Sequence, residues 1–275
     1  MEKIMFNSGY MKKTVLMTLM IIFTGAMNVF AEENISAEEL VKKASLSAYY
    51  GGNDGRTMAR MKIVDANGRE QLRQFTILRK DIEEGGEQRF LVVFSRPADV
   101  SGTVFMVHKK VTGDDDRWLY LPALDLVKRI SAGDKRTSFV GAHYFYEDVS
   151  GRATTEDTHQ IVGQDEKFYI LEHKPKSAES VEFASYKTWI DKSNHLPMKI
   201  EYYDNNGKAY RLIEALKVEM VQNIPTVMDA KVTNLVDNSY TLMAFRKMQY
   251  DIGVPEDVFT ERALRNPPAQ WLKGQ

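Results

Sequence analysis

Apolar and polar residues alternate along most of the chain after Gly52, and this period of two predicts β-strands. In residues 197–203 (PMKIEYY), for example, apolar side chains fall at every second position, so the strand has one apolar and one wet face. Asn-Gly pairs at residues 67–68 and 206–207 separate runs of this kind and are typical of tight hairpin turns. The pattern therefore predicts a meander of antiparallel strands without an internal repeat or a long linker.

Four short segments are apolar on both faces instead of one. They are FLVVF, VFMV, WLYL and FYIL, at residues 90–94, 104–107, 118–121 and 168–171. Strands of this kind must be covered on both sides, yet helix patterns are scarce. We expect either that the sheet curls on itself with few helices inside, or that one face lines a cavity for an apolar ligand. An ordinary sandwich core is the third interpretation.

The clearest helix pattern begins at Ser36, which forms a capping box with Glu39. Apolar residues then recur at helical spacing, and Gly51 and Gly52 can end the helix. A second, short helix is predicted within residues 255–264. The apolar stripe of the first helix either packs on the domain as ordinary core or covers the mouth of a cavity.

The first 31 residues have the pattern of a cleaved secretory signal. Lys12 and Lys13 precede an apolar stretch, and Val29 and Ala31 form the small-x-Ala pattern that signal peptidase accepts. Polar and small residues interrupt the stretch, so a permanent membrane anchor is less favoured. We therefore expect residues 1–31 to be removed, residues 32–275 to form a single domain, and the mature protein to be secreted into the periplasm.

The composition excludes several kinds of chemistry. The chain has no cysteine, so it has no lipid-modified N-terminal Cys, no disulfides and no thiolate metal site. A net charge of -1 gives no reason to expect nucleic acid as a partner. The five histidines lack metal-ligand spacing, and neither a nucleophile elbow nor a phosphate-binding loop is present. Asp114, Asp115 and Asp116 lack the spacing of a calcium loop, which favours a solvated hairpin tip. We therefore expect no catalytic residues, no metal and no cofactor, and predict that the protein is not an enzyme.

Two consecutive stretches, DRWLYLPALDLVKRIS and RTSFVGAHYFYEDVS, resemble the outer-membrane lipoprotein-sorting (LolA-like) family. The resemblance is to the subgroup associated with exporters of the resistance-nodulation-division (RND) type. The matching positions are Trp118, Tyr120, Leu121, Pro122, Ala123, Leu124, Val127, Arg129, Ile130, Arg136, Ser138, Phe139, Gly141, Tyr146, Glu147 and Asp148. Ala142 and His143 depart from the pattern, because the family more often has a small polar residue followed by Asp there.

The resemblance implies a mainly β fold of the α+β kind. It consists of a single strongly curved antiparallel sheet, a half-open barrel, with a few helices plugging the concave side. It also implies a periplasmic carrier that binds acyl chains of lipoproteins or lipids in a hydrophobic cavity and moves them towards the outer membrane. The alternative is an accessory module that docks on an RND-type membrane exporter. An enzyme acting on lipids is disfavoured, because no nucleophile motif is present.

Such a cavity would be lined by alternate residues of the two-sided strands. A register error of one residue would reverse the lining set. Our first choice for lipid binding is Phe90, Val92 and Phe94, and a second set comprises Phe105, Trp118, Tyr120 and Met243.

The segment around residues 143–149 reads as a strand. We expect Arg129 and Arg136 to pair with Glu147 and Asp148, and so to tie the hairpin at residues 118–130 to that strand. The other interpretation places these charged residues at the cavity mouth, where they would bind a lipid head group or a loop of a transporter.

Overall fold

The computed structural model describes residues 35–272, which belong to one compact unit. The predicted signal sequence, residues 1–31, lies outside the described residues. Among the described residues, no helix has the length and hydrophobicity that crossing a membrane requires.

The described chain is built around one antiparallel sheet with neighbours in the order β6-β5-β4-β3-β2-β1-β13-β12-β11-β10-β9-β8-β7. The sheet is not closed, and β6 and β7 are its two edges. Its strands are β1 (Asp54–Val64), β2 (Glu70–Asp81), β3 (Gln88–Arg96), β4 (Val104–Lys109), β5 (Asp116–Leu121), β6 (Leu126–Ile130), β7 (Asp157–Gln164), β8 (Phe168–Pro175), β9 (Ser185–Asp191), β10 (Pro197–Tyr203), β11 (Ala209–Val221), β12 (Ile224–Asn234) and β13 (Tyr240–Tyr250). The predicted mainly β fold with a half-open, curved sheet is confirmed.

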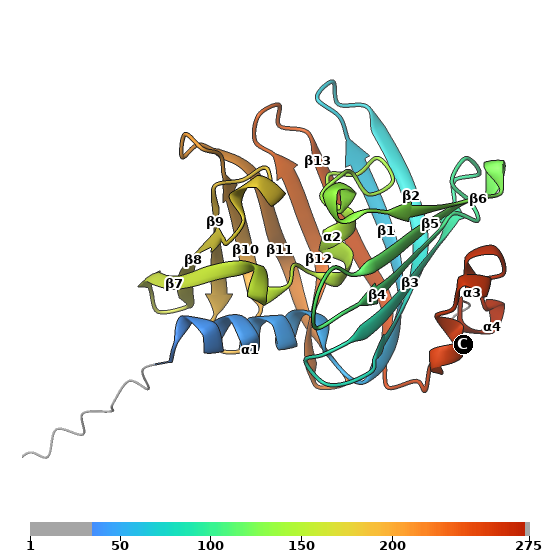
Figure 1. The fold of residues 1–275 in the computed structure, drawn as a ribbon, viewed down its shortest axis with the longest axis horizontal. Coiled ribbons are helices and arrows are strands. Elements are labelled where there is room, and N and C mark those ends of the chain that lie inside the picture. Colours follow the sequence, from blue (N-terminus) through green and yellow to red (C-terminus); the bar gives the residue numbers. More distant parts are fainter. Residues whose placement is uncertain (1–34, 273–275) are drawn as a thin grey trace, which may run out of the picture. The chain divides into compact units, whose positions relative to one another are not determined.

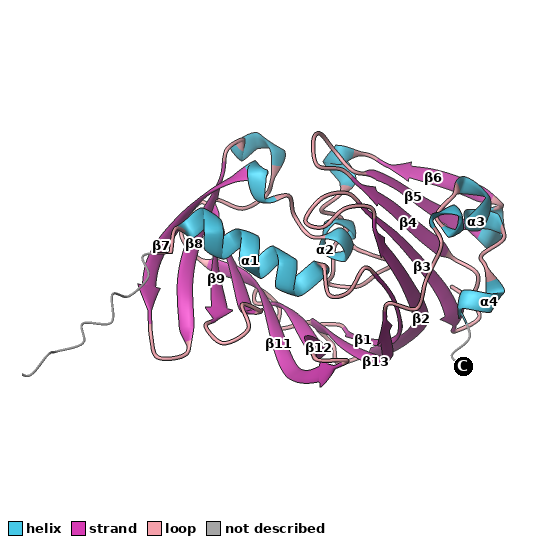
Figure 2. Cartoon of the chain, turned by 90° about the horizontal axis from the view of Figure 1, so that it is seen from below, coloured by secondary structure: helices cyan, strands magenta, loops and turns pink. Residues whose placement is uncertain are grey.

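The four α-helices found within residues 35–272 lie on the two faces of this sheet. Figures 1 and 2 show α1 (Ala37–Tyr49) and α2 (Tyr146–Ser150) on the concave side, and α3 (Glu261–Arg265) and α4 (Ala269–Leu272) outside β2 to β5. Single 3-10 turns complete the connections: η1 (Pro122–Leu124), η2 (Ala132–Asp134), η3 (Thr154–Glu156), η4 (Ala178–Ser180) and η5 (Glu256–Val258).

The apolar strands β3 and β4 are covered on both faces, as the sequence requires. Phe90, Val92 and Phe94 are buried in a cluster on the concave side. Leu91 and Val93 are buried in a second cluster on the convex side, against the C-terminal segment that carries α3 and α4. The sandwich alternative is therefore wrong, and the second cover is supplied by residues 252–272.

Helix α1 forms as its sequence predicts. The Ser36 hydroxyl accepts a hydrogen bond from the backbone N–H of Glu39 at 3.1 Å, which satisfies one of the free donors of the first turn. Leu40 and Ala44 are buried against β8 and β9. The helix ends at Tyr49, just before the two predicted terminating glycines. The predicted short C-terminal helix is also present, as η5 and α3.

The segment between β6 and β7, residues 131–156, is named the crossing segment here, because it connects the two edge strands across the concave side (Figure 1). The strand predicted around residues 143–149 is wrong, since this part contains α2. The Asp148 carboxylate accepts a hydrogen bond from the backbone N–H of Phe145 at 2.6 Å, and so caps the start of α2. Local capping and burial of Tyr146 and Glu147 override the alternating pattern.

The acidic run at Asp114 to Asp116 joins β4 to β5, as a hairpin tip would. Asp114 is exposed, but Asp115 is largely buried and binds Arg117 at 2.6 Å. The expectation of a wholly solvated tip is therefore wrong for Asp115, whose charge is neutralised within the fold.

Candidate functional site

A cavity of about 430 Å³ lies between α1, the concave face of the sheet and the crossing segment. Its volume falls within the range of roughly 300–1,000 Å³ that is usual for small-molecule sites. Apolar side chains from both halves of the sheet contribute to the wall. They include Phe75, Ile77, Phe90, Val92, Ile190, Ile200, Ile213, Val227, Ala230, Met243, Phe245 and Met248.

Helix α1 spans this cavity, and its two ends are held differently. Its N-terminal half packs through Leu40 and Ala44 on β8 and β9. At its C-terminal end, the backbone carbonyl of Tyr49 accepts hydrogen bonds from Arg79 and from Gln88, the latter at 2.8 Å. The Arg79 guanidinium also binds the carbonyl of Gly52 at 2.7 Å. The helix is thus anchored by apolar packing on one side of the sheet and by directional polar bonds on the other.

Five of the seven predicted lining residues lie on the concave face. Phe90, Val92 and Met243 line the cavity directly. Phe94 and Phe105 belong to the same cluster, but Phe139 of the crossing segment fills the space above them, with ring centroids 5.7 and 5.4 Å away. The register chosen for β3 is therefore correct, and the crossing segment closes one end of the cavity.

Trp118 and Tyr120 are on the opposite face, so their expected place in the cavity wall is wrong. In the β4–β5 ladder, Leu119 is paired with Phe105 and faces inward, whereas Trp118 is paired with Met106. Trp118 and Tyr120 pack against the convex cluster under the C-terminal segment. Successive side chains of a strand point to opposite faces, so Trp118 and Tyr120 point outward because Leu119 between them points inward.

The remaining motif positions of this hairpin are divided between the two faces: Val127 packs in the convex cluster, whereas Leu121 and Ile130 pack in the concave cluster. The Pro122–Leu124 turn is a 3-10 turn that connects β5 and β6. Arg265 of α3 binds Asp125 in this turn at 2.9 Å, and its guanidinium lies 5.6 Å from the ring centroid of Tyr120. The hairpin is therefore scaffold that holds the C-terminal segment against the sheet.

The sequence interpretation missed most of the cavity wall on β9 to β13. Ile200, Ile213, Ala230 and Phe245 belong to ordinary amphipathic strands, which we had interpreted as having one wet face. Their alternating apolar positions were visible in the sequence, but the helix that covers them is distant in the chain. No local pattern indicates which apolar face of a strand lines a cavity and which packs as core.

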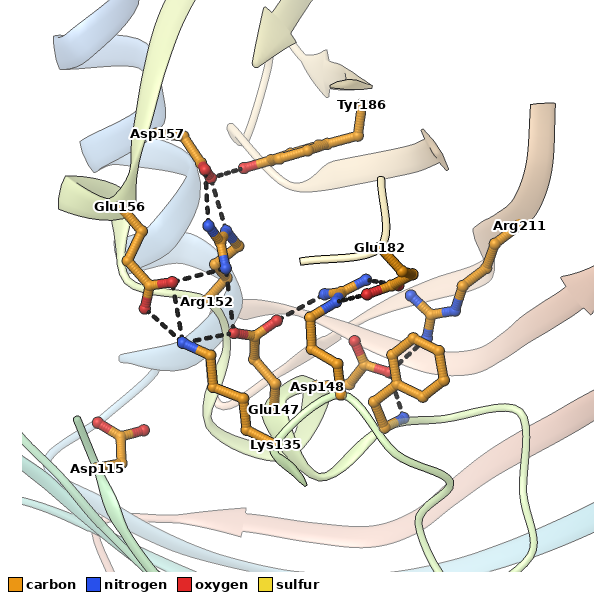
Figure 3. A network of polar contacts seen from close by, with 12 residues as sticks. Asp115, Lys135, Glu147, Asp148, Arg152, Glu156, Asp157, Glu182, Tyr186 and Arg211 are labelled. Carbon is orange, nitrogen blue, oxygen red and sulfur yellow. Dashed lines mark hydrogen bonds and ion pairs between the residues drawn. The ribbon is translucent and has the colours of Figure 1, made fainter. Parts of the chain in front are cut away.

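A buried ionic network, built mainly from residues of the crossing segment, forms one side of the cavity wall (Figure 3). At its centre is Glu147, only 2% exposed. Its carboxylate lies 2.6 Å from the Arg136 guanidinium, 3.3 Å from the Lys135 ammonium and 3.4 Å from the Arg152 guanidinium. Burial by itself raises the pKa of Glu147, but the charges of Arg136, Arg152 and Lys135 outweigh burial and lower it. Glu147 is therefore ionised at neutral pH.

The predicted ion pairs are half right. Arg136 does bind Glu147. Arg129, however, binds Asp116 on the neighbouring strand and its side chain is 68% exposed, so its predicted pairing with the acidic pair is wrong. Asp148 binds Arg211 of β11 instead. The reason is that Glu147 and Asp148 sit on a helix at the concave side, whereas Arg129 projects from the sheet edge.

Each cation around Glu147 also binds a second carboxylate: that of Lys135 is Glu156, within the crossing segment, whereas those of Arg152 and Arg136 lie outside it. Arg152 binds Asp157 at the start of β7 at 2.8 Å, and the Tyr186 hydroxyl of β9 donates to the same carboxylate at 2.8 Å. Arg136 binds Glu182 at 2.7 Å. The network therefore fixes the crossing segment between β6 and β7.

The motif residues at the tip of the crossing segment shape this insertion. The Ser138 hydroxyl donates to the carbonyl of Ala142 at 2.6 Å and closes a tight loop. Gly141 stands in this loop with φ of +82°, a conformation that favours glycine. His143, at the departure from the family pattern, makes ring contacts to the hydroxyls of Thr241 and Ser239 at 2.8 and 2.7 Å. The loop thus drives Phe139 into the concave cluster.

An aromatic ladder crosses β8, β9 and β10 at the concave face. His173 is paired with Tyr186, and Tyr186 with Tyr202, in successive strands. The His173 and Tyr186 rings are stacked with centroids 4.3 Å apart, and Tyr186 and Tyr202 follow at 5.1 Å. Burial, together with the neighbouring His159, lowers the pKa of His173 to about 3. This ladder contributes polar groups to the cavity wall, as Glu147, Asp148 and Arg152 also do.

Comparisons with known proteins agree with this architecture. A family model described as an uncharacterized protein matches residues 86–266, more than half of the chain. The chain belongs to that family. Among proteins with curated descriptions, none matches the chain.

Several solved structures are similar to this chain in fold. A DUF1329 family protein from Desulfovibrio piger is 29% identical, with a TM-score of 0.75, over 83% of this chain and 97% of that one. A putative outer membrane lipoprotein-sorting protein domain from Vibrio parahaemolyticus is 26% identical, with a TM-score of 0.76, over 83% and 98%. A LolA superfamily protein from Nitrosomonas europaea, at 17% identity and a TM-score of 0.64 over 83% and 99%, shares the fold.

The resemblance of this family member to outer-membrane lipoprotein-sorting (LolA-like) proteins is therefore confirmed. The association with RND-type exporters stays a prediction. Within residues 35–272, no group of three or more side chains could hold a metal ion.

Proposed function

We propose that this protein is a periplasmic carrier that binds acyl chains of lipoproteins or lipids and moves them towards the outer membrane. The observation that carries the proposal is the cavity of about 430 Å³ between α1 and the concave face, lined mainly by apolar side chains. The likeness to a putative outer membrane lipoprotein-sorting domain supports the same class of cargo.

The energetics of such a cavity suit acyl chains. Each methylene removed from water contributes about 0.8 kcal/mol, so roughly six buried methylenes contribute about 5 kcal/mol without any directional bond. Met243 and Met248 in the wall can adapt to chains of different shape, because the thioether side chain is unbranched and flexible. The cavity therefore selects for apolar chains in general and tolerates variation along them.

The secretory pattern of residues 1–31 supports a carrier that moves between the membranes. We propose that signal peptidase removes this segment and that the mature protein is released into the periplasm. A carrier between two membranes needs this freedom and needs its cargo shielded from water.

Native mass spectrometry of the mature chain, gently purified, tests the proposal. We expect a dissociable mass adduct of lipid size, and saturable binding of a dansyl-labelled fatty acid after the adduct has been removed. The proposal is wrong if the folded, delipidated protein shows no saturable probe binding. If a protein that does not bind the probe captured a membrane exporter, this result would support the accessory role instead.

A further inference from the structure

Phe139 forms the end wall of the cavity on the side of the crossing segment. Its ring lines the cavity together with that of Phe75, and the two ring centroids are 6.4 Å apart. The same ring packs on Phe94 and Phe105, with centroids 5.7 and 5.4 Å away, and neither of these residues lines the cavity. Phe139 therefore stands between the cavity and the closed apolar cluster behind it.

The crossing segment holds this ring in place through its backbone and a neighbouring ring. The backbone N–H of Phe139 donates to the carbonyl of Tyr144 at 2.8 Å, and the carbonyl of Phe139 accepts from the N–H of Ala142 at 3.0 Å. The Tyr146 ring lies 5.5 Å away, with 89° between the two ring planes. Because its main chain and its side chain are both engaged, Phe139 is a fixed wall. One inserted side chain thus sets the depth of the cavity at this end.

The cavity wall beside Phe139 is apolar. Phe75, Ile77, Phe90 and Val92 line it on β2 and β3. A polar head group placed at this closed end would lose its water without gaining hydrogen bonds in return, which is costly. The methyl end of an acyl chain carries no polar group, so this is the end that fits against Phe139.

The volume of the cavity limits how many methylenes it can hold. A water molecule takes up roughly 30 Å³ of the liquid and a methylene is of similar size, so a cavity of about 430 Å³ holds roughly 14 methylenes. This number corresponds to one acyl chain. A second chain of the same length would double the volume required, and the fixed wall at Phe139 closes the direction in which the cavity could extend.

Resting on the proposed function, we infer that the cavity holds a single acyl chain and that Phe139 limits the buried length of that chain to roughly 14 carbons. The methyl end stops against the ring, and carbons beyond this length stay in water. The ligand class is a lipid that offers one chain to the cavity, such as a fatty acid or a lysophospholipid. A lipid with two chains leaves the second chain outside.

A series of saturated fatty acids, from octanoate to octadecanoate, tests this inference by displacement of the dansyl-labelled fatty acid. Each added methylene should tighten binding about fourfold as long as it is buried in the cavity. The gain should stop at about 14 carbons, because further methylenes remain in water. Native mass spectrometry with excess tetradecanoate should show one bound chain per protein.

Variants at Phe139 should move this limit. Phe139→Ala opens the space beside Phe94 and Phe105, so the gain should continue for about three more carbons, since a phenyl ring has roughly the volume of three methylenes. Phe139→Leu keeps more of the core packing and should move the limit by about one carbon. Phe259→Ala is the matched control, because both rings are 2% exposed but Phe259 lies in the convex cluster. It should keep the wild-type limit.

NMR of the wild-type complex provides a readout that does not depend on the stability of a variant. Tetradecanoate labelled with carbon-13 at its methyl end should show nuclear Overhauser contacts to the ring protons of Phe139 and Phe75. The same fatty acid labelled next to the carboxylate should show no contact to these rings.

The possible failures are distinguishable. A limit that stays at the same length in both folded Phe139 variants, or ring contacts from the carboxylate end, would overturn the role of Phe139. Affinity that keeps rising to octadecanoate in the wild type, or two bound chains, would overturn the single-chain limit. Each of these results leaves the carrier proposal intact, whereas absence of saturable binding by every fatty acid would overturn both.

Discussion

Replacing Glu147 by Gln tests whether the buried network holds the crossing segment in place. The substitution keeps the size of the side chain and removes its charge. In the folded protein the Glu147 carboxylate contacts three cations, of which Arg136 at 2.6 Å is the nearest. Without it, the cations remain buried with less compensation, and the crossing segment loses its central tie.

The magnitude follows from what each cation keeps. Removing one member of a buried ion pair typically costs about 3–5 kcal/mol. Here Arg136 still binds Glu182 at 2.7 Å and Arg152 still binds Asp157 at 2.8 Å. Lys135 still binds Glu156 at 2.9 Å. Because every cation retains a carboxylate, we expect the lower end, a loss of about 3 kcal/mol in the free energy of unfolding.

Urea unfolding followed by circular dichroism at neutral pH measures this loss. Asp114→Asn is the matched control, since it neutralises an exposed carboxylate 3.9 Å from Lys135 in the same network, and it should cost less than about 1 kcal/mol. A double-mutant cycle should find coupling between Arg136 and Glu147 and additivity between Arg129 and Glu147. If Glu147→Gln were no more costly than Asp114→Asn, the network would not hold the segment.

Three further predictions concern the cavity, acid stability and the outer face. Val92→Trp should abolish binding of the dansyl-labelled fatty acid at a folding cost of about 1–3 kcal/mol. Val93→Trp, which overpacks the convex side, should cost as much stability and still bind the probe. Loss of binding in both variants would contradict a cavity at Val92. Burial depresses the pKa of His173 from 6.5 to about 3 in the folded protein. The contribution of neutral His173 to the free energy of unfolding is therefore complete above pH 6.5, the pKa in the unfolded chain, and is lost as the pH falls below it. The loss between about pH 8 and about pH 5 is about 2 kcal/mol, and His173→Phe should remove that part of the pH dependence in urea melts; an unchanged pH profile would contradict it. Trp118→Ala should lower stability by about 2 kcal/mol, by removing half-buried packing under the C-terminal segment, without changing probe affinity, and a weaker affinity would return Trp118 to the ligand site.

The fold could be predicted because its determinants are local. The alternating pattern, the Asn-Gly turns and the capping box at Ser36 each specify an element within a few residues, and the motif resemblance then indicates how the strands combine. The apolar pattern on both faces of residues 90–94 also correctly predicted that both faces of this strand are covered. It did not indicate which face packs against protein and which face lines the cavity.

The errors occur where distant segments decide the outcome. Trp118 and Tyr120 were misplaced because the inward register of β5 depends on its pairing with β4, which places Leu119 beside Phe105. The acidic pair at Glu147 was read as strand, since nothing local shows that residues 131–156 cross the sheet between its edges. His173 was dismissed as a scattered histidine, because its partner His159 is 14 residues away in sequence and meets it only across the β7–β8 ladder.

Photocrosslinking with a fatty acid that carries a diazirine in the middle of its chain tests the central claim most directly. If the cavity between α1 and the concave face holds acyl chains, the crosslinks should map to peptides that contain α1, Ile77, Val92 and Met243, and excess unlabelled fatty acid should compete them away. Crosslinks that map to the convex side at Trp118 and Tyr120, or that resist competition, would contradict the account.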